Sequence, residues 1–341
     1  MTVTSAPPRT SVAARRHGTA LRVLSIDSMF MEALRAGVFE ARVHSVFDRV
    51  INLQRTTGEL FTLASRTMDD APMTAIVDSE GFGTSGVSVG APVSAIDGAM
   101  QVGDSLVLHM AAASIWKTTL PSYGMAPGRM FDQLRLARSY LARHGVRGGM
   151  TAPAHADGAF AQEVAAALEQ RATSLFDAMA RGRHADACRH AVSMLGLGPG
   201  LTPSGDDFLV GLFAILNVAG SPCHGWLDGG AAVLAHAGEA TNAISLAALN
   251  AASGGRVRKS IAALIESLLH GNPETLVQPL RRVLAIGATS GADLVAGILA
   301  GLELNLQVQA TRSLASSQHC STTAYRGSHA AATAIPLSTG A

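Results

Sequence analysis

Two adjacent carboxylates, Asp206 and Asp207, lie in the segment of this chain best suited to bind a small polar molecule. From Leu197 to Leu212 it reads L-G-P-G-L-T-P-S-G-D-D-F-L-V-G-L, a glycine-rich loop that opens an apolar helix. Glycine lets a ligand approach the backbone, and the free N–H groups of a helix N-terminus suit a phosphate or a carboxylate. Because two carboxylates would repel a bare anion, we expect a ligand with an anionic end and an N–H donor end. Mg²⁺ held by Asp206 and Asp207 is the alternative, and no firm cofactor is predicted.

The same residues also fit a purely structural interpretation. Ser204 is expected to be the N-cap, its hydroxyl accepting a hydrogen bond from a backbone N–H two or three residues on. Asp206 and Asp207 would then occupy the first turn, where negative charge is favoured by about 0.3–1 kcal/mol. However, the loop holds more glycine than a cap requires, and Thr202 adds a second hydroxyl beside Ser204. These two features favour the ligand-binding interpretation.

A shorter copy of the motif follows downstream. Ser290–Gly297 repeats the pattern S-G-x-D, three apolar residues and Gly of Ser204–Gly211, so that Asp293 aligns with Asp207. Two such helix starts could face one another across a site. We therefore predict Asp206 and Asp207 as catalytic residues. The predicted substrate or phosphate contacts of the two motifs are Gly198, Gly200, Thr202, Ser204, Gly205, Ser290, Gly291 and Asp293.

Two further segments could contribute to binding. Thr241 and Ser245 lie amid an apolar helix and could line a cavity, although hydrogen bonds from their hydroxyls to helix carbonyls explain them equally well. Arg256, Arg258 and Lys259 stand at a predicted helix start, where cations oppose the helix dipole and a bound anion could compensate. A solvated basic face is the alternative; of these three we predict only Arg256 as a ligand contact.

Several familiar chemistries lack their motifs. The string from Gly196 to Leu201 lacks the third glycine of a dinucleotide-binding loop and follows an apparent helix rather than a strand. No G-x-x-x-x-G-K-[ST] or H-E-x-x-H occurs in the chain. The string G-V-S-V-G at 86–90 begins a short apolar run predicted as a strand, and is not the strand-to-helix turn of a G-x-S-x-G nucleophile elbow. Nucleotide loops, serine-type nucleophiles and zinc hydrolases are therefore disfavoured.

Composition narrows the class of protein further. The 341 residues are 48% hydrophobic and 15% charged, with a net charge of +1, which offers no field to recruit nucleic acid or an acidic membrane. The three cysteines form no C-x-x-C pair, and no apolar run reaches the ~18 residues of a membrane span. Because no apolar core follows Arg15-Arg16, no signal peptide is predicted. We expect a cytoplasmic protein that binds neither nucleic acid nor a membrane.

Apolar patterning divides the chain into a β-rich part and a helical part. Short apolar runs separated by Gly and Asp turns follow a short helix near Ser28–Arg35, and helical periodicity begins near Gly128. The predicted fold class is α+β: a small N-terminal sheet or open barrel, then an Ala-rich helical domain for which the repeat suggests two related halves. The predicted domains are a disordered leader (1–18), a β-rich domain (19–125), a helical domain with the loop (126–310) and a disordered tail (311–341). The later helices are expected at Ala231–Ala252, Val257–His270, Glu274–Ile286 and Gly291–Leu304.

The string G-L-G-P-G-L-T-P-S-G-D-D-F-L-V-G, from Gly196 to Gly211, resembles the hallmark of the AllH-type family, which includes a subunit of oxamate carbamoyltransferase. T-N-A-I-S at 241–245, A-A-S-G-G at 251–255 and G-A-T-S-G-A-D-L-V-A-G-I-L at 287–299 support the resemblance. It extends over about residues 35–305.

The resemblance implies that the chain works with two other subunits in anaerobic allantoin breakdown, a branch of purine catabolism. Together they interconvert oxalurate plus phosphate with oxamate plus carbamoyl phosphate. The partners would be other protein subunits and a small molecule of the carbamoyl phosphate or oxalurate class. Such a transfer needs a cradle for phosphate, donors for a developing oxyanion and an acceptor for amide N–H groups. The loop N–H groups with Arg256 or Arg258 could supply the first two, and Asp206 or Asp207 the third.

We therefore expect an enzyme subunit of a carbamoyltransferase complex. Two alternatives stay open. The chain could be a non-catalytic subunit that assembles or regulates its partners, or a stand-alone Mg²⁺-dependent enzyme acting on a small phosphorylated or carboxylated metabolite.

Overall fold

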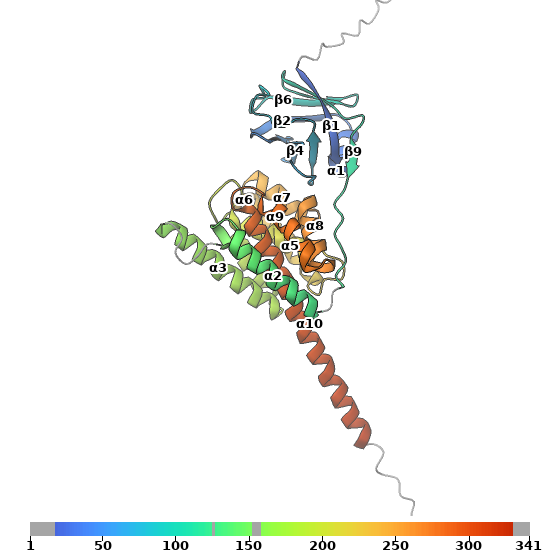
Figure 1. The fold of residues 1–341 in the computed structure, drawn as a ribbon, viewed down its shortest axis with the longest axis vertical. Helices are drawn as coiled ribbons and strands as arrows, with labels where there is room; N and C mark the ends of the chain where they lie inside the picture. Colours follow the sequence, from blue (N-terminus) through green and yellow to red (C-terminus); the bar gives the residue numbers. More distant parts are fainter. Residues whose placement is uncertain (1–17, 125–126, 152–157, 330–341) are drawn as a thin grey trace, which may run out of the picture. The chain divides into compact units, whose positions relative to one another are not determined.

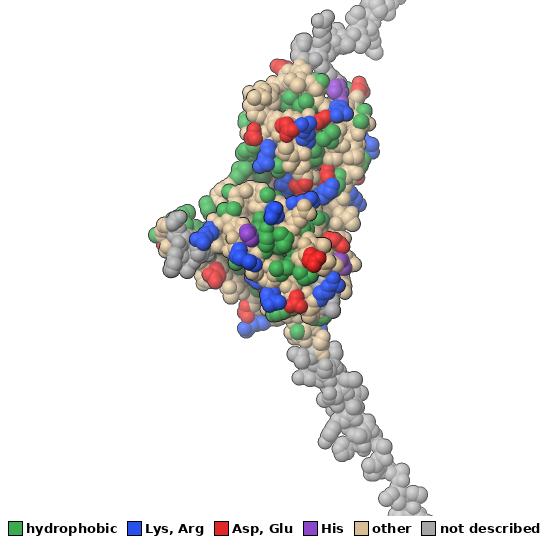
Figure 2. Space-filling model, viewed as in Figure 1, with side chains coloured by type: hydrophobic (Ala, Val, Ile, Leu, Met, Phe, Trp, Pro, Cys, Tyr) green, Lys and Arg blue, Asp and Glu red, His purple; other side chains and the backbone are tan. Residues whose placement is uncertain are grey.

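The computed structural model describes residues 18–124, 127–151 and 158–329. The chain divides into two compact units, residues 1–117 and 118–341. The first is built mainly of strands and the second of helices, which confirms the predicted α+β order (Figure 1). The predicted leader lies outside the described residues apart from Gly18. On the face that Figure 2 shows, acidic and basic side chains are interspersed over each unit.

The first unit is a closed barrel of eight strands with one extra strand, β9. Its elements are β1 (Thr19–Asp27), α1 (Ser28–Arg35), β2 (Phe39–Val46), β3 (Val50–Gln54), β4 (Leu60–Ser65), β5 (Thr74–Val77), β6 (Pro92–Ile96), β7 (Ala99–Val102), β8 (Leu106–His109) and β9 (Ser114–Trp116). The barrel order is β1-β5-β4-β3-β2-β6-β7-β8, and β8 pairs back onto β1. The rings of Phe30, Phe39 and Phe61 pack against one another inside, with centroids 4.7–5.8 Å apart.

The long first strand closes this barrel, where the sequence predicts a sheet or an open barrel. Its first half, Thr19–Arg22, pairs with β8, and Val23–Ile26 pairs with β5 across a register shift between Val23 and Ser25. Such a shift bends a strand and increases its twist, so that β1 can pair with β8 along its first half and with β5 along its second half. Closure leaves no open edge in the eight-stranded part.

The second unit consists of α2 to α10 and two short 3₁₀ turns. Its elements are α2 (Pro127–His144), η1 (Gly149–Thr151), α3 (Ala159–Ala180), α4 (His184–Met194), α5 (Ser204–Leu216), η2 (His224–Trp226), α6 (Leu227–Ala240), α7 (Ala243–Ser253), α8 (Lys259–His270), α9 (Pro273–Leu284) and α10 (Ser290–His329). Every residue of α5 is buried, so α5 forms the centre of the core. The stretch Ser290–Ser313 is long and apolar enough to cross a membrane, and 67% of its 18-residue apolar window is buried inside the helical unit.

Two expectations about helices differ from the structure. The single helix predicted over Ala231–Ala252 is two helices, α6 and α7, because Asn242 caps the second: its Oδ1 accepts hydrogen bonds from the N–H groups of Ile244 and Ser245 at 3.0 and 3.1 Å. In addition, α10 continues to His329, into the stretch for which a disordered tail is predicted. Residues 330–341 lie outside the described part.

Asn242→Ala is expected to lower the free energy of unfolding by about 1 kcal/mol, because it removes an N-cap. The amide Nδ2 of Asn242 also donates to the carbonyl of Leu201 at 2.8 Å. Asn272, the N-cap of α9, is a matched control, because its cap carries no bond to this loop. Both variants should lose similar stability in urea, but only Asn242→Ala should speed proteolysis near Leu201. Equal proteolysis of both variants would contradict a role for Asn242 in holding the loop.

Helices α5 and α10 run parallel and in close contact. A Cβ on Gly211 would overlap the carbonyl oxygen of Leu294, and one on Gly297 would overlap that of Phe208. These positions correspond in the repeated motif, because Gly211 aligns with Gly297 and Phe208 with Leu294. The crossing is therefore locally two-fold symmetric, as the repeat suggests, and it brings both helix N-termini to the same end.

Candidate functional site

The N-termini of α5 and α10 meet directly. The hydroxyls of Thr202, before α5, and of Ser290, the first residue of α10, are 2.7 Å apart. The structure therefore brings the two copies of the motif together, as the repeat suggests.

Each motif places its aspartate against the serine of the other. The Asp207 carboxyl faces the hydroxyls of Ser290 and Thr202, and the Asp293 carboxyl faces the hydroxyl of Ser204. Ser204 aligns with Ser290 and Asp207 with Asp293, so the contacts are reciprocal. We refer to Asp207 and Asp293 as the acid pair.

Burial makes the acid pair unusual. Asp207 is 7% exposed and Asp293 is fully buried. Burial raises the pKa of each carboxyl to about 7, although hydrogen bonds from the neighbouring hydroxyls lower it. At Asp207, the negative charges of Asp293 and Asp206 raise the pKa further. In the described part of the chain, one oxygen of each carboxyl and the Ser204 hydroxyl have no well-aligned hydrogen bond. Buried polar atoms without partners are uncommon and mark places where a proton, water or ligand group is to be expected.

A third segment, which the sequence does not single out, completes this cluster. The N–H of Met150 donates to Asp293 Oδ1 at 2.7 Å. Gly149, at φ +53°, lies so close to Ser204 Oγ and the Asp293 carboxylate that a Cβ would overlap both. The available signal is the dipeptide Gly148-Gly149, since consecutive glycines mark a close backbone approach.

The neighbouring acid, Asp206, has a different environment. Its two oxygens accept hydrogen bonds from the N–H of Gly196, at 2.9 Å, and from the Thr241 hydroxyl, and Ser245 lies beside it. Burial raises the pKa of Asp206, and these three donors oppose the rise. Asp206 therefore ties the loop to the start of α7. In the described residues, no group of three or more His, Cys, Asp or Glu side chains has a metal-binding arrangement.

The helix start itself differs from the expected cap. Pro203, not Ser204, occupies the N-cap position of α5, and no side chain caps it. Instead, the N–H of Gly205 donates to Leu197, and those of Asp206 and Asp207 donate to Pro203. The N–H groups of Gly205, Asp206 and Asp207 are thus engaged within the chain. Because the carbonyls of Leu197 and Pro203 accept these hydrogen bonds, the Ser204 hydroxyl is not needed as a cap and can face Asp293.

The remaining predicted contacts separate into near and distant ones. Gly198 packs against Ser204, and Gly200 lies on the exposed part of the loop. Gly205 and Gly291 pack against the ends of the preceding helices, where a Cβ would overlap the carbonyl oxygens of Met194 and Val283 respectively.

Arg256 follows Gly255, which contacts Asn217 at the C-terminal end of α5. A helix of this length spans ~20 Å, so the structure does not bring the backbone of Arg256 to the loop.

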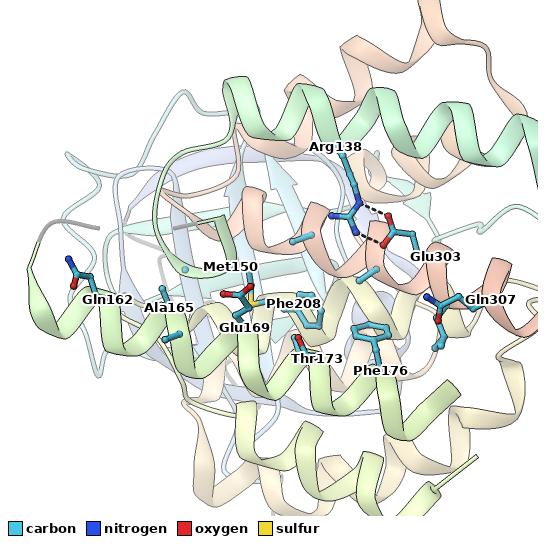
Figure 3. Close-up of a pocket in the computed structure, with 16 residues that line it drawn as sticks. Arg138, Met150, Gln162, Ala165, Glu169, Thr173, Phe176, Phe208, Glu303 and Gln307 are labelled. Atoms are coloured by element: carbon cyan, nitrogen blue, oxygen red, sulfur yellow. Dashed lines mark hydrogen bonds and ion pairs between the residues drawn. The ribbon is translucent and has the colours of Figure 1, made fainter. Parts of the chain in front are cut away.

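A cavity of about 750 Å³ lies next to the acid pair, and we call it the groove. Its walls come from α2, η1, α3, α5 and α10, and Gly149 and Met150 belong to it. Figure 3 shows Arg138 of α2 reaching in from one side and Glu169 and Thr173 of α3 from the other. The second unit thus holds a solvent-accessible space beside a buried polar cluster.

Comparisons with known proteins agree with this division into two parts. The family model described as oxamate carbamoyltransferase subunit AllH matches residues 194–302, which include both motifs of the acid pair. The model described as the AllH family N-terminal domain matches residues 22–115, which form most of the barrel. Together the two matches cover more than half of the chain. No solved structure matches it.

Proposed function

Because the chain belongs to the AllH family, we propose that it is one subunit of a carbamoyltransferase complex that interconverts oxalurate plus phosphate with oxamate plus carbamoyl phosphate. The family name supports a subunit role. We propose in addition that the reaction belongs to cytoplasmic purine catabolism and that the chain works with partner subunits. Within it, we assign the acid pair to the site where the substrate reacts.

The observation that carries this proposal is the reciprocal arrangement of the acid pair with Ser204 and Ser290. In the forward reaction a phosphate oxygen bonds to the carbamoyl carbon of oxalurate. The bond from that carbon to the nitrogen of the oxamate half breaks, and the nitrogen takes up a proton while phosphate gives one up. A group with a pKa near the working pH is the most effective acid or base for such an exchange. Asp207 and Asp293, each with a pKa of about 7, meet that requirement.

Turnover by the co-expressed complex tests the proposal. We expect phosphate-dependent formation of carbamoyl phosphate from oxalurate when this chain is produced with the subunits encoded beside it, and none from the chain alone. Asp207→Asn should lower the rate by roughly 100-fold, the lower end of what a positioned proton donor contributes. Asp132→Asn, an exposed carboxylate of α2, is the matched control and should keep the wild-type rate.

A non-catalytic subunit is the second candidate, and the near-complete burial of the acid pair favours it. In that case Asp207→Asn would leave the rate of every assembled complex unchanged, or prevent assembly altogether. Size-exclusion chromatography of the variant complex, run beside the assay, separates the two functions. An intact Asp207→Asn complex with wild-type turnover would overturn the catalytic assignment.

A further inference from the structure

One residue, Gly149, separates the groove from the acid pair. It lines the groove on one side and contacts Ser204 Oγ and the Asp293 carboxylate on the other. The next residue, Met150, also lines the groove while its N–H donates to Asp293. No side chain therefore stands between this part of the groove wall and the unpartnered oxygen atoms of the cluster.

The polar groups in the groove carry both signs of charge. Arg138 uses Nε and Nη2 to bond both carboxylate oxygens of Glu303 in a bidentate ion pair. Its third nitrogen, Nη1, takes no part in that pair, and Figure 3 shows it on the side away from Glu303. A guanidinium can hold a second carboxylate through its remaining donors. Glu169 enters from α3 and can accept hydrogen bonds from N–H groups.

The remaining wall combines the neutral polar side chains of Gln162, Thr173 and Gln307 with apolar side chains, many of them small or flat. Phe176 and Phe208 meet edge to face with their ring centroids 6.0 Å apart, and alanines of α3 and α10 line the space beside them. Sites for small molecules are clefts of roughly 300–1,000 Å³ in which an apolar wall surrounds a few polar groups. The volume of the groove, about 750 Å³, lies within this range, and its lining holds more polar groups than such sites usually have.

We propose that the groove binds a small carboxylate that also carries an amide or ureido N–H group. The carboxylate pairs with Arg138 Nη1, the N–H group with Glu169, and the planar body lies against Phe176 and Phe208. Gly149 then lies between the bound molecule and the acid pair, where any side chain would stand in the way. This inference rests on the proposed function only in naming the ligand class; the groove and its charges stand independently of it.

Binding by the full-length chain tests the groove directly. The probes are oxamate and oxalurate, and their binding is measured by saturation-transfer NMR and by calorimetry. Thr173→Trp places a large side chain in the groove from an exposed position of α3 and should weaken binding about tenfold or more. Arg138→Met should do the same for both probes, since it removes the guanidinium and keeps an unbranched apolar stem. Gln170→Trp, exposed on α3 but outside the groove, is the matched control and should bind as the wild type does.

The outcomes separate the groove from the reaction. Binding that is kept in Gln170→Trp and lost in Thr173→Trp supports the groove, even if the complex forms no carbamoyl phosphate. Equal binding of the probes by Thr173→Trp and wild type would overturn the assignment of the groove as a binding site. So would the failure of both probes to bind wild type, both as the chain alone and in the co-expressed complex. A complex that turns over equally well with Thr173→Trp would leave the proposed reaction standing and remove the groove from it.

Discussion

Raising the pH from 5 to 8 is expected to lower the free energy of unfolding of this chain, and Asp293→Asn is expected to abolish much of that loss. The cause is the acid pair. Each carboxyl has a pKa of about 7 in the folded chain because it is buried, whereas an aspartate in an unfolded chain has a pKa near 3.9. The folded state therefore binds more protons than the unfolded state between these two values.

The sign of the effect follows from that difference. The free energy of unfolding falls as the pH rises wherever the folded state holds the extra proton. The stabilisation that each raised pKa provides is therefore fully present below about pH 4 and is lost as the pH rises through 7. For one such carboxyl the loss between pH 5 and pH 8 is about 3 kcal/mol. Asp207 faces the carboxylates of Asp293 and Asp206, and like charges oppose a second ionisation. The losses at Asp207 and Asp293 are consequently coupled rather than additive.

Urea unfolding of the isolated chain at several pH values measures this slope. Asparagine has nearly the shape of a protonated aspartate, so Asp293→Asn should unfold at a higher urea concentration than wild type at pH 8 and at a similar one at pH 5. Asp207→Asn should behave alike. Asp132→Asn, exposed on α2, should retain the wild-type slope. Parallel curves for wild type and Asp293→Asn across this range would show that the buried carboxyls are ionised at pH 5.

Much of this site could be predicted from the repeat alone. The pattern shared by Ser204–Gly211 and Ser290–Gly297 places one serine and one aspartate on the first turn of each of two helices. The suggestion that these helix starts face one another agrees with the structure, since Thr202 and Ser290 are in hydrogen-bond contact. A repeated local pattern is informative because the same contacts must be made twice.

The sequence could not distinguish Asp206 from Asp207. Neighbouring residues on a helix point about 100° apart, so one faces α10 and the other faces the start of α7, and only the packing of the helices decides which. The same limit applies to Gly149, whose contact with Asp293 joins distant parts of the chain. Arg256 shows the converse: its residue type suits an anion, but the turn after α7 lies at the other end of α5.

Barrel closure is a similar case of long-range pairing. The short apolar runs predict strands, but a run cannot show that β1 bonds to both β5 and β8. That choice depends on the register shift in β1, which changes the direction of the strand without changing its composition.

Gly297→Ala is expected to destabilise the chain by about 3 kcal/mol, the upper end of the usual cost of overpacking. A Cβ at this position would overlap the carbonyl oxygen of Phe208, which belongs to the backbone of a fully buried helix and cannot move aside as a side chain can. Alanine is favoured over glycine in a helix by only about 1 kcal/mol, so the clash outweighs the gain. Gly211→Ala should cost a similar amount, because it makes the equivalent contact with Leu294.

The control for this substitution lies on α6, where Gly238 is exposed and a Cβ would meet nothing within 4 Å. Gly238→Ala should leave stability unchanged or raise it by up to about 1 kcal/mol in the same urea titration. Separation of α5 from α10 would also admit water to the acid pair, and burial is what raises the pKa of Asp207 and of Asp293. Gly297→Ala should therefore show a weaker fall of stability between pH 5 and pH 8 than wild type. If Gly297→Ala and Gly238→Ala proved equally stable, the close contact of α5 and α10 would be wrong, and with it the geometry of the acid pair.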